Sequence, residues 1–143
     1  MQLVYSSGGR EKYFKQTIVG DCVTRAICNA TGKDYLDVYN DLKELAKEER
    51  ITKIHKKKSS VRNGVYIKTC HKYIEQHLGY KWYPTMQVGK GCQVHLTENE
   101  LPNGVLIVQV SNHLTCVKDG VIYDTFDPSR EGTRCVYGYW FLD

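Results

Sequence analysis

Residues 16–31, QTIVGDCVTRAICNAT, combine a tight turn with the start of a helix. Gly20 permits the turn, and Asp21 is a residue type that accepts the first free N–H groups of a helix as an N-cap. Cys22 then lies in the first helical turn, where the positive end of the helix dipole favours the thiolate. Gln16 lies six residues earlier and can point its amide at the same place. A thiolate beside an amide donor is half of an acyl-transfer site.

The rest of the chain predicts helices first and strands second. Apolar residues at helical spacing continue the first helix to residue 31 and predict two more helices, over about 35–50 and 66–78. The near-continuous apolar run 105–110 predicts a central strand that is buried on both faces. We therefore expect a single α+β domain, residues 1–143, in which the Cys22-bearing helix packs on a C-terminal antiparallel sheet. Shorter strands are expected at 3–5, 80–83, 113–117, 121–126 and 135–141.

Composition and charge exclude some classes of protein. The net charge of +4 is too mild to argue for nucleic acid, and no apolar run reaches membrane-spanning length. Met1 opens no signal-peptide pattern. The six cysteines are then expected to be free thiols in a reducing compartment, which predicts a cytoplasmic protein without a membrane partner. Cys92 and His95 lack a second close pair at zinc-finger spacing, so we expect no metal and no cofactor.

A run of basic residues occupies the polar stretch 52–64. Charge runs of this kind are usually solvated loops, and that is the interpretation we favour from sequence. The alternative is a loop that flanks a cleft and attracts an acidic partner. The basic residues are Lys53, Lys56, Lys57, Lys58 and Arg62.

A cysteine nucleophile needs a base, and the base needs a third group to hold its tautomer. His113 is the best candidate base because it begins a predicted strand after a break in the chain. If the following hairpin has a two-residue turn, Asp124 becomes the diagonal neighbour of His113 on the same face. If the turn has three residues, the register slips by one and Asp127 takes that place. The residues alone permit both.

The order Gln16, Cys22, His113, Asp resembles the papain-like cysteine peptidase superfamily. In that superfamily an oxyanion-hole Gln lies six residues before the Cys, and the His and Asn or Asp lie on neighbouring strands of the following sheet. Asp127-Pro128 is more similar to the bacteriocin-processing and staphopain-like members, which favours Asp127 as third residue. Asp124-Thr125-Phe126-Asp127, with the segments around Cys22, also resembles small uncharacterised bacteriophage proteins.

This resemblance implies a cysteine protease, a thiol protease with a catalytic triad. It would hydrolyse a peptide or isopeptide bond of a peptide or protein substrate, in the cytoplasm of a bacterial host if the protein is phage-encoded. Two other functions stay open. One is a related acyl-transfer enzyme, such as a transglutaminase or an amidase. The other is a non-catalytic phage binding protein on the same fold. The substrate and the oligomeric state are left undetermined.

Overall fold

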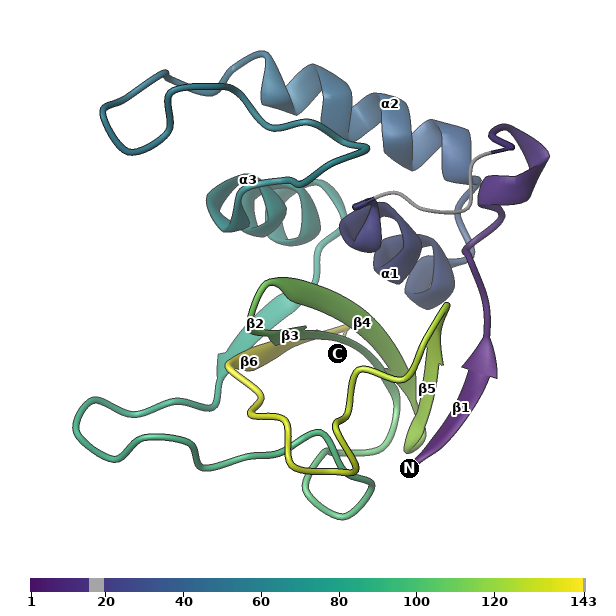
Figure 1. The fold of residues 1–143 in the computed structure, drawn as a ribbon, viewed down its shortest axis with the longest axis vertical. Coiled ribbons are helices and arrows are strands. Elements are labelled where there is room, and N and C mark those ends of the chain that lie inside the picture. Colours follow the sequence, from purple (N-terminus) through teal and green to yellow (C-terminus); the bar gives the residue numbers. More distant parts are fainter. Residues whose placement is uncertain (16–19, 143) are drawn as a thin grey trace.

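The computed structural model describes residues 1–15 and 20–142, and it confirms the α+β class. Figure 1 shows two layers, with the helices on one side and a six-stranded sheet on the other. The helical elements are η1 (Arg10–Lys12), α1 (Cys22–Thr31), α2 (Tyr35–Ala46), α3 (Ile67–His71) and η2 (Lys72–His77, a π-helical continuation of α3). The strands are β1 (Gln2–Tyr5), β2 (Lys81–Pro84), β3 (Val105–Val110), β4 (His113–Lys118), β5 (Val121–Asp124) and β6 (Gly138–Phe141).

The sheet is mixed, which corrects the expectation of an antiparallel sheet. Its strand order is β1-β5-β4-β3-β6-β2, and every neighbouring pair is antiparallel except β1 and β5. The parallel register places Tyr5 beside Asp124, at one end of the sheet. The chain continues from there through η1 toward the start of α1. The parallel direction of β1 therefore depends on the tertiary position of η1 and α1. The alternation of apolar and polar residues in a strand does not reveal its direction.

The core lies on both faces of the sheet. β3 is central and buried, as expected. Its Ile107 packs in the cluster under the helices, whereas Leu106 and Val108 belong to a cluster on the opposite face. Apolar residues of α1 at helical spacing, such as Val23 and Ile27, join the first cluster. The helical layer thus rests on the sheet through α1, which brings the N-terminus of α1 to the sheet.

Element boundaries follow the sequence closely at the first helix and less closely elsewhere. α1 spans the expected residues and ends at Gly32, whose positive φ of 73° lets its N–H reach the carbonyl of Cys28 at 2.9 Å. α2 ends at Ala46, earlier than expected, and the third predicted helix divides into α3 and η2. β5 and β6 are shorter than predicted because the chain around 125–137 forms a loop instead.

The hairpin between β4 and β5 has the two-residue turn. Val117 pairs with Ile122, and the two turn residues Asp119 and Gly120 have φ of 47° and 81°. Positive φ at both positions is the signature of a type I′ turn, which matches the twist of the flanking strands. Asp119 also accepts a hydrogen bond from the N–H of Gly104 at 2.8 Å, which fixes the turn against the neighbouring loop. The register is therefore the one that aligns Asp124 with β4.

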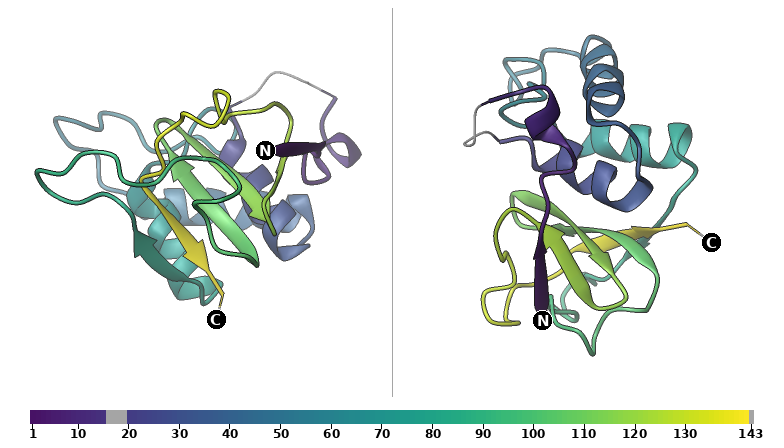
Figure 2. Two further views of the ribbon diagram at one scale, coloured as in Figure 1. Left: turned by 90° about the horizontal axis from the view of Figure 1, so that it is seen from below. Right: turned by 90° about the vertical axis from the view of Figure 1, so that its right-hand side faces the viewer.

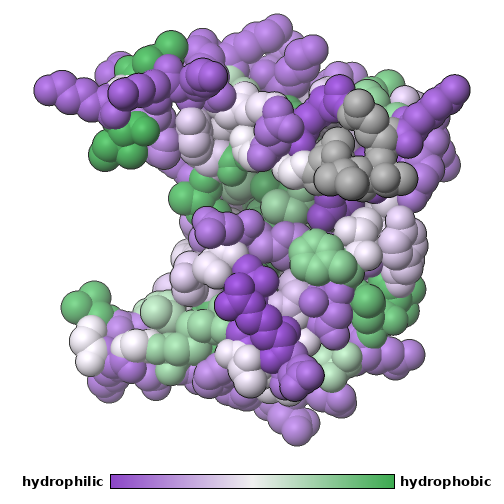
Figure 3. All heavy atoms as spheres, in the orientation of Figure 1, coloured by the Kyte–Doolittle hydropathy of each residue, from purple (hydrophilic) through white to green (hydrophobic). Residues whose placement is uncertain are grey.

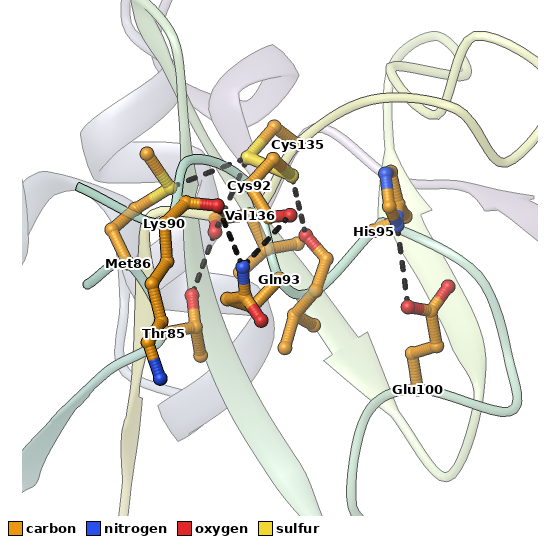
Figure 4. The surroundings of a disulfide bond; sticks show 10 residues. Thr85, Met86, Lys90, Cys92, Gln93, His95, Glu100, Cys135 and Val136 are labelled. Carbon is orange, nitrogen blue, oxygen red and sulfur yellow. Dashed lines mark hydrogen bonds and ion pairs between the residues drawn. A yellow bond between two sulfur atoms is a disulfide. The ribbon is translucent and has the colours of Figure 1, made fainter. Parts of the chain in front are cut away.

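A disulfide joins Cys92 to Cys135, which corrects the expectation of six free thiols (Figure 4). The two residues are 43 positions apart in sequence. Backbone hydrogen bonds between the segments that carry them, including Val136 N–H to the carbonyl of Val94 at 2.8 Å, lay these segments side by side. Cys135 thereby lies outside β6, not within it. The spacing of the cysteines in the sequence does not predict this disulfide, because it depends on the contact between two distant loops.

Candidate active site

Cys22 is the first residue of α1, and the turn that precedes it packs closely against the loop that contains Asn63. A Cβ on Gly20 would lie 2.6 Å from the carbonyl oxygen of Asn63, so only glycine fits at position 20 against this loop. This contact fixes the turn that delivers Cys22 to the helix start. The thiol is half-buried and free. It therefore combines access to solvent with the positive end of the helix dipole.

His113 opens β4 directly after a two-residue turn, in which Asn112 has φ of 57°. Its ring nitrogen Nε2 lies 2.7 Å from Oδ2 of Asp124, at the end of β5. Both side chains are almost fully buried, at 8% and 3% exposure. The two-residue hairpin causes this meeting, because continuing its register places Asp124 opposite Thr115, two residues from His113 on the same face.

The expected pairing of His113 with Asp127 is wrong. The carboxylate of Asp127 accepts a hydrogen bond from the backbone N–H of Ser129 at 2.9 Å and so holds the loop beyond β5. The physical reason is register: the three-residue turn that would align Asp127 with His113 does not form. Asp127 thus has a structural role in the loop beyond β5, and Asp124 takes the place beside His113.

The thiol of Cys22 and the ring of His113 interact closely enough for each to shift the pKa of the other. Burial of the thiol opposes ionisation, but the interaction with His113, with smaller contributions from the backbone of Leu114 and the charge of Arg25, outweighs it and holds the pKa of Cys22 below its ordinary value. Burial likewise opposes the charged ring, yet Asp124 and Cys22 raise the pKa of His113 to about 9. Since Nε2 faces Asp124, Nδ1 is the nitrogen left for the thiol. The site favours a thiolate–imidazolium pair.

The other free cysteines behave in the opposite way. Burial raises the pKa of Cys28 and of Cys116 to about 12, and it raises the pKa of Cys70 as well. In the part of the chain that the structure describes, none of these three thiols has a charged hydrogen-bond partner, so burial dominates. Cys22 is therefore the one free thiol among the described residues whose surroundings favour the nucleophilic form.

Asp21 lies at the N-cap position but does not cap α1, which corrects the expected role. Its carboxylate is buried and accepts hydrogen bonds from Arg10 at 3.1 Å, from Arg25 and from the hydroxyl of Tyr35. Arg25 also lies 3.6 Å from the carboxylate of Asp124. The sequence suggests that Asp21 would oppose a thiolate at Cys22, but two guanidinium groups balance its charge.

Arg25 thus links Asp21, at the N-terminus of α1, to Asp124, the hydrogen-bond partner of His113. A chain of alternating charges runs from Arg10 through Asp21 and Arg25 to Asp124. Sequence reasoning missed this network. One signal for it exists, since Asp21 and Arg25 stand four residues apart and so share one side of a helix. Arg10 has no such signal, because only the tertiary fold brings η1 to α1.

Cys22 and His113 line one cleft of about 1670 Å³ between the helical layer and the sheet. Figure 3 shows this face of the molecule hollowed between an upper and a lower arm. One wall comes from the segment 48–76 and includes part of the basic loop, and the other comes from 109–114 with Phe126 and Tyr137. The reacting groups are thus open to an extended ligand.

Gln16 falls outside the described residues, so its expected place beside Cys22 stays a prediction. Within residues 1–15 and 20–142, no group of histidine, cysteine and acidic side chains is arranged to hold a metal ion. The same part of the chain contains no helix with both the length and the apolar character needed to cross a bilayer.

No protein-family model, no curated protein and no solved structure matches this chain.

Proposed function

We propose that the protein is a cysteine peptidase-like hydrolase with a papain-like arrangement and a Cys22–His113–Asp124 triad. One arrangement carries the proposal: Cys22 begins a helix and lines the same cleft as His113, the two groups shift each other's pKa, and His113 in turn lies 2.7 Å from Asp124. Acyl transfer through a thioester requires a nucleophile next to a base, and a carboxylate that orients the base. The open cleft around Cys22 supports an extended peptide as substrate.

The proposed reaction begins with attack of the Cys22 sulfur on the carbonyl carbon of a peptide or isopeptide bond. His113 holds the proton that the thiol has lost and gives it to the leaving amine when the C–N bond breaks. This leaves a thioester on Cys22. Water, deprotonated by His113, then attacks the thioester and releases the acid and the thiol. Asp124 keeps the imidazole oriented through both steps, and the backbone N–H of Cys22 with Gln16 would stabilise the oxyanion.

The test is digestion of a proteome-derived peptide mixture in water enriched in ¹⁸O, read by mass spectrometry. Hydrolysis by this site yields new carboxyl termini that carry ¹⁸O. The Cys22→Ala variant is the matched control and should yield none. Adding a primary amine separates hydrolysis from acyl transfer, because a transferase would attach the amine to the new terminus. A wild-type protein that produces neither product at any pH between 5 and 9 would contradict the proposal.

A further inference from the structure

Positive charge is concentrated on one wall of the cleft. Residues 48–76, which form that wall, contain eight lysines and arginines and three glutamates, a net charge of +5, although the whole chain carries only +4. The remaining residues therefore carry a net charge of −1. A mild total thus conceals a strongly basic segment, which composition alone cannot show.

The three glutamates of this segment already have partners within the chain, and Glu75 is paired with His71 at 2.6 Å. Glu48 pairs with Lys72 at 3.3 Å, and Glu49 accepts hydrogen bonds from Ser59 and Thr69. Lys53, Lys56 and Lys57, by contrast, are exposed. Across residues 1–15 and 20–142 no carboxylate forms an ion pair with any of these three lysines. Their charge is left for an external partner.

The loop that carries these lysines has a defined position. Glu49 ties Ser59 to the end of the helical layer, and the hydroxyl of Tyr66 donates to the carbonyl of Lys57 at 2.6 Å. The ring of His55 packs on Tyr66 with 3.9 Å between ring centroids. At its base the loop meets Gly20 through Asn63, two residues from Cys22. A loop held this way keeps its charges together next to the cleft, which several of its residues line.

The loop overhangs the cleft that contains Cys22. Thr52, His55 and Lys58 are among the lining residues, beside the reacting pair. Figures 1 and 2 show the loop projecting on the same side of the molecule as the loop that follows β2, and Figure 3 shows it as a largely hydrophilic arm above the hollow. The opposite wall, 109–114 with Phe126 and Tyr137, carries no charged group other than His113. An anionic ligand would meet attraction on one side and no repulsion on the other.

We infer that the substrate of the proposed hydrolase is an acidic peptide segment, whose carboxylates face Lys53, Lys56 and Lys57 while its backbone passes Cys22. This inference rests on the proposed function for the choice of a peptide over other polyanions, because the reacting pair at the cleft is suited to acyl chemistry. It favours the second interpretation of the basic stretch, a loop that flanks the cleft and attracts an acidic partner.

The test measures binding with the Cys22→Ala variant, so that it does not depend on turnover. The probe is a fluorescein-labelled 12-residue peptide of alternating Glu and Ala, compared by anisotropy with a Gln-Ala peptide of equal length. We expect the Glu peptide to bind more tightly by about tenfold at low salt, with the difference shrinking as salt rises. Lys56→Glu with Lys57→Glu should weaken Glu-peptide binding by about tenfold or more. Lys12→Glu with Lys33→Glu, an equal charge change away from the cleft, should weaken it by less than about twofold.

Equal binding of the two peptides, or equal loss in both pairs of variants, would overturn the inference. A 12-nucleotide single strand that binds more tightly than the Glu peptide, with the same dependence on Lys56 and Lys57, would overturn it in favour of a nucleic-acid surface. Failure of the proposed function has a different outcome: the Glu peptide would bind in a charge-dependent way while the wild-type protein cleaves nothing. Cleavage without preference for acidic peptides would instead uphold the enzyme and overturn the inference.

Discussion

Two histidine–carboxylate pairs lie along the same cleft, and their distances are nearly equal. His113 and Asp124 are 2.7 Å apart, and His71 and Glu75 are 2.6 Å apart. The surroundings differ. The side chains of the first pair are 8% and 3% exposed, whereas those of the second are 32% and 37% exposed. The first pair also interacts with the thiol of Cys22, at the N-terminus of α1.

The second pair has a structural explanation. The ring of His71 packs against Trp82 and Trp140, with centroids 4.7 and 4.9 Å away, and Glu75 accepts a hydrogen bond from the indole of Trp140 at 3.5 Å. It therefore ties η2 to the sheet. The comparison teaches that a short histidine–carboxylate distance does not define a catalytic site. Burial, a nucleophile on the other ring nitrogen and a balanced charge network are needed as well.

The largest expected effect separates the two pairs directly. Cys22→Ala or His113→Ala should lower kcat/KM for peptide hydrolysis by about 10³-fold or more, because each removes a group that acts in the chemical step. Cys22→Ala should change the free energy of unfolding by less than about 1 kcal/mol, since the side chain is small and half-buried. Urea denaturation checks that. A loss of about 3 kcal/mol or more would instead identify Cys22 as a packing residue.

The next effect concerns the buried charges that only the first pair has. Arg25→Met should lower the free energy of unfolding by about 3 kcal/mol, because it leaves the carboxylates of Asp21 and Asp124 buried with one cation fewer. The measurement is urea denaturation followed by circular dichroism. Lys43→Met, at an exposed position of α2, is the control and should leave the midpoint unchanged. Equal midpoints for the two variants would show that Arg25 does not stabilise the site.

A smaller effect tests which acid orients His113. Asp124→Asn should lower kcat/KM by roughly 10- to 100-fold, since Asn keeps a hydrogen bond but loses the charge. Activity requires protonated His113, so its pKa of about 9 sets the alkaline limb of the pH profile. Removing the carboxylate that raises this pKa should move the limb to lower pH. Asp127→Asn should neither lower kcat/KM nor move the alkaline limb. If a folded Asp127→Asn variant loses more kcat/KM than Asp124→Asn, the three-residue register would be indicated instead.

The smallest effect is expected at the second pair. Glu75→Gln keeps the size of the side chain and its acceptor for the indole, so kcat/KM should change by less than about twofold. The control for correct folding is the near-ultraviolet circular dichroism of the two tryptophans. A tenfold loss of kcat with unchanged KM would place His71 and Glu75 in the chemistry and break the distinction between the pairs.

The sequence determines much of the fold and of the site through local patterns. The boundaries of α1 follow from its apolar spacing and Gly32, and the juxtaposition of Cys22 with His113 follows from one helix start and one strand start. The prediction of Asp127 as the third residue is wrong, because two- and three-residue turns differ by a single position and shift every partner, and the resemblance favours the wrong one. The structure settles the register through the paired positive φ values at Asp119 and Gly120.

Other features depend on contacts between distant segments and leave no local pattern. The parallel direction of β1 and the Cys92–Cys135 disulfide both belong to this group. Asp21 shows a further limit of sequence-based prediction. An acidic residue before a helix normally predicts an N-cap, but the carboxylate of Asp21 accepts hydrogen bonds from two guanidinium groups and Tyr35 instead. Local preference is overridden there by a buried charge network.

The most direct test of the thiolate–imidazolium pair is the rate at which iodoacetamide alkylates Cys22 as a function of pH, read by peptide mass spectrometry. The wild-type protein should show an apparent pKa for Cys22 below that of an ordinary thiol, about 8.5. His113→Gln should raise it above that value, because burial is then uncompensated, whereas His71→Gln should leave it in place. A wild-type value at or above the ordinary one, or a value that His113→Gln does not move, would contradict the account.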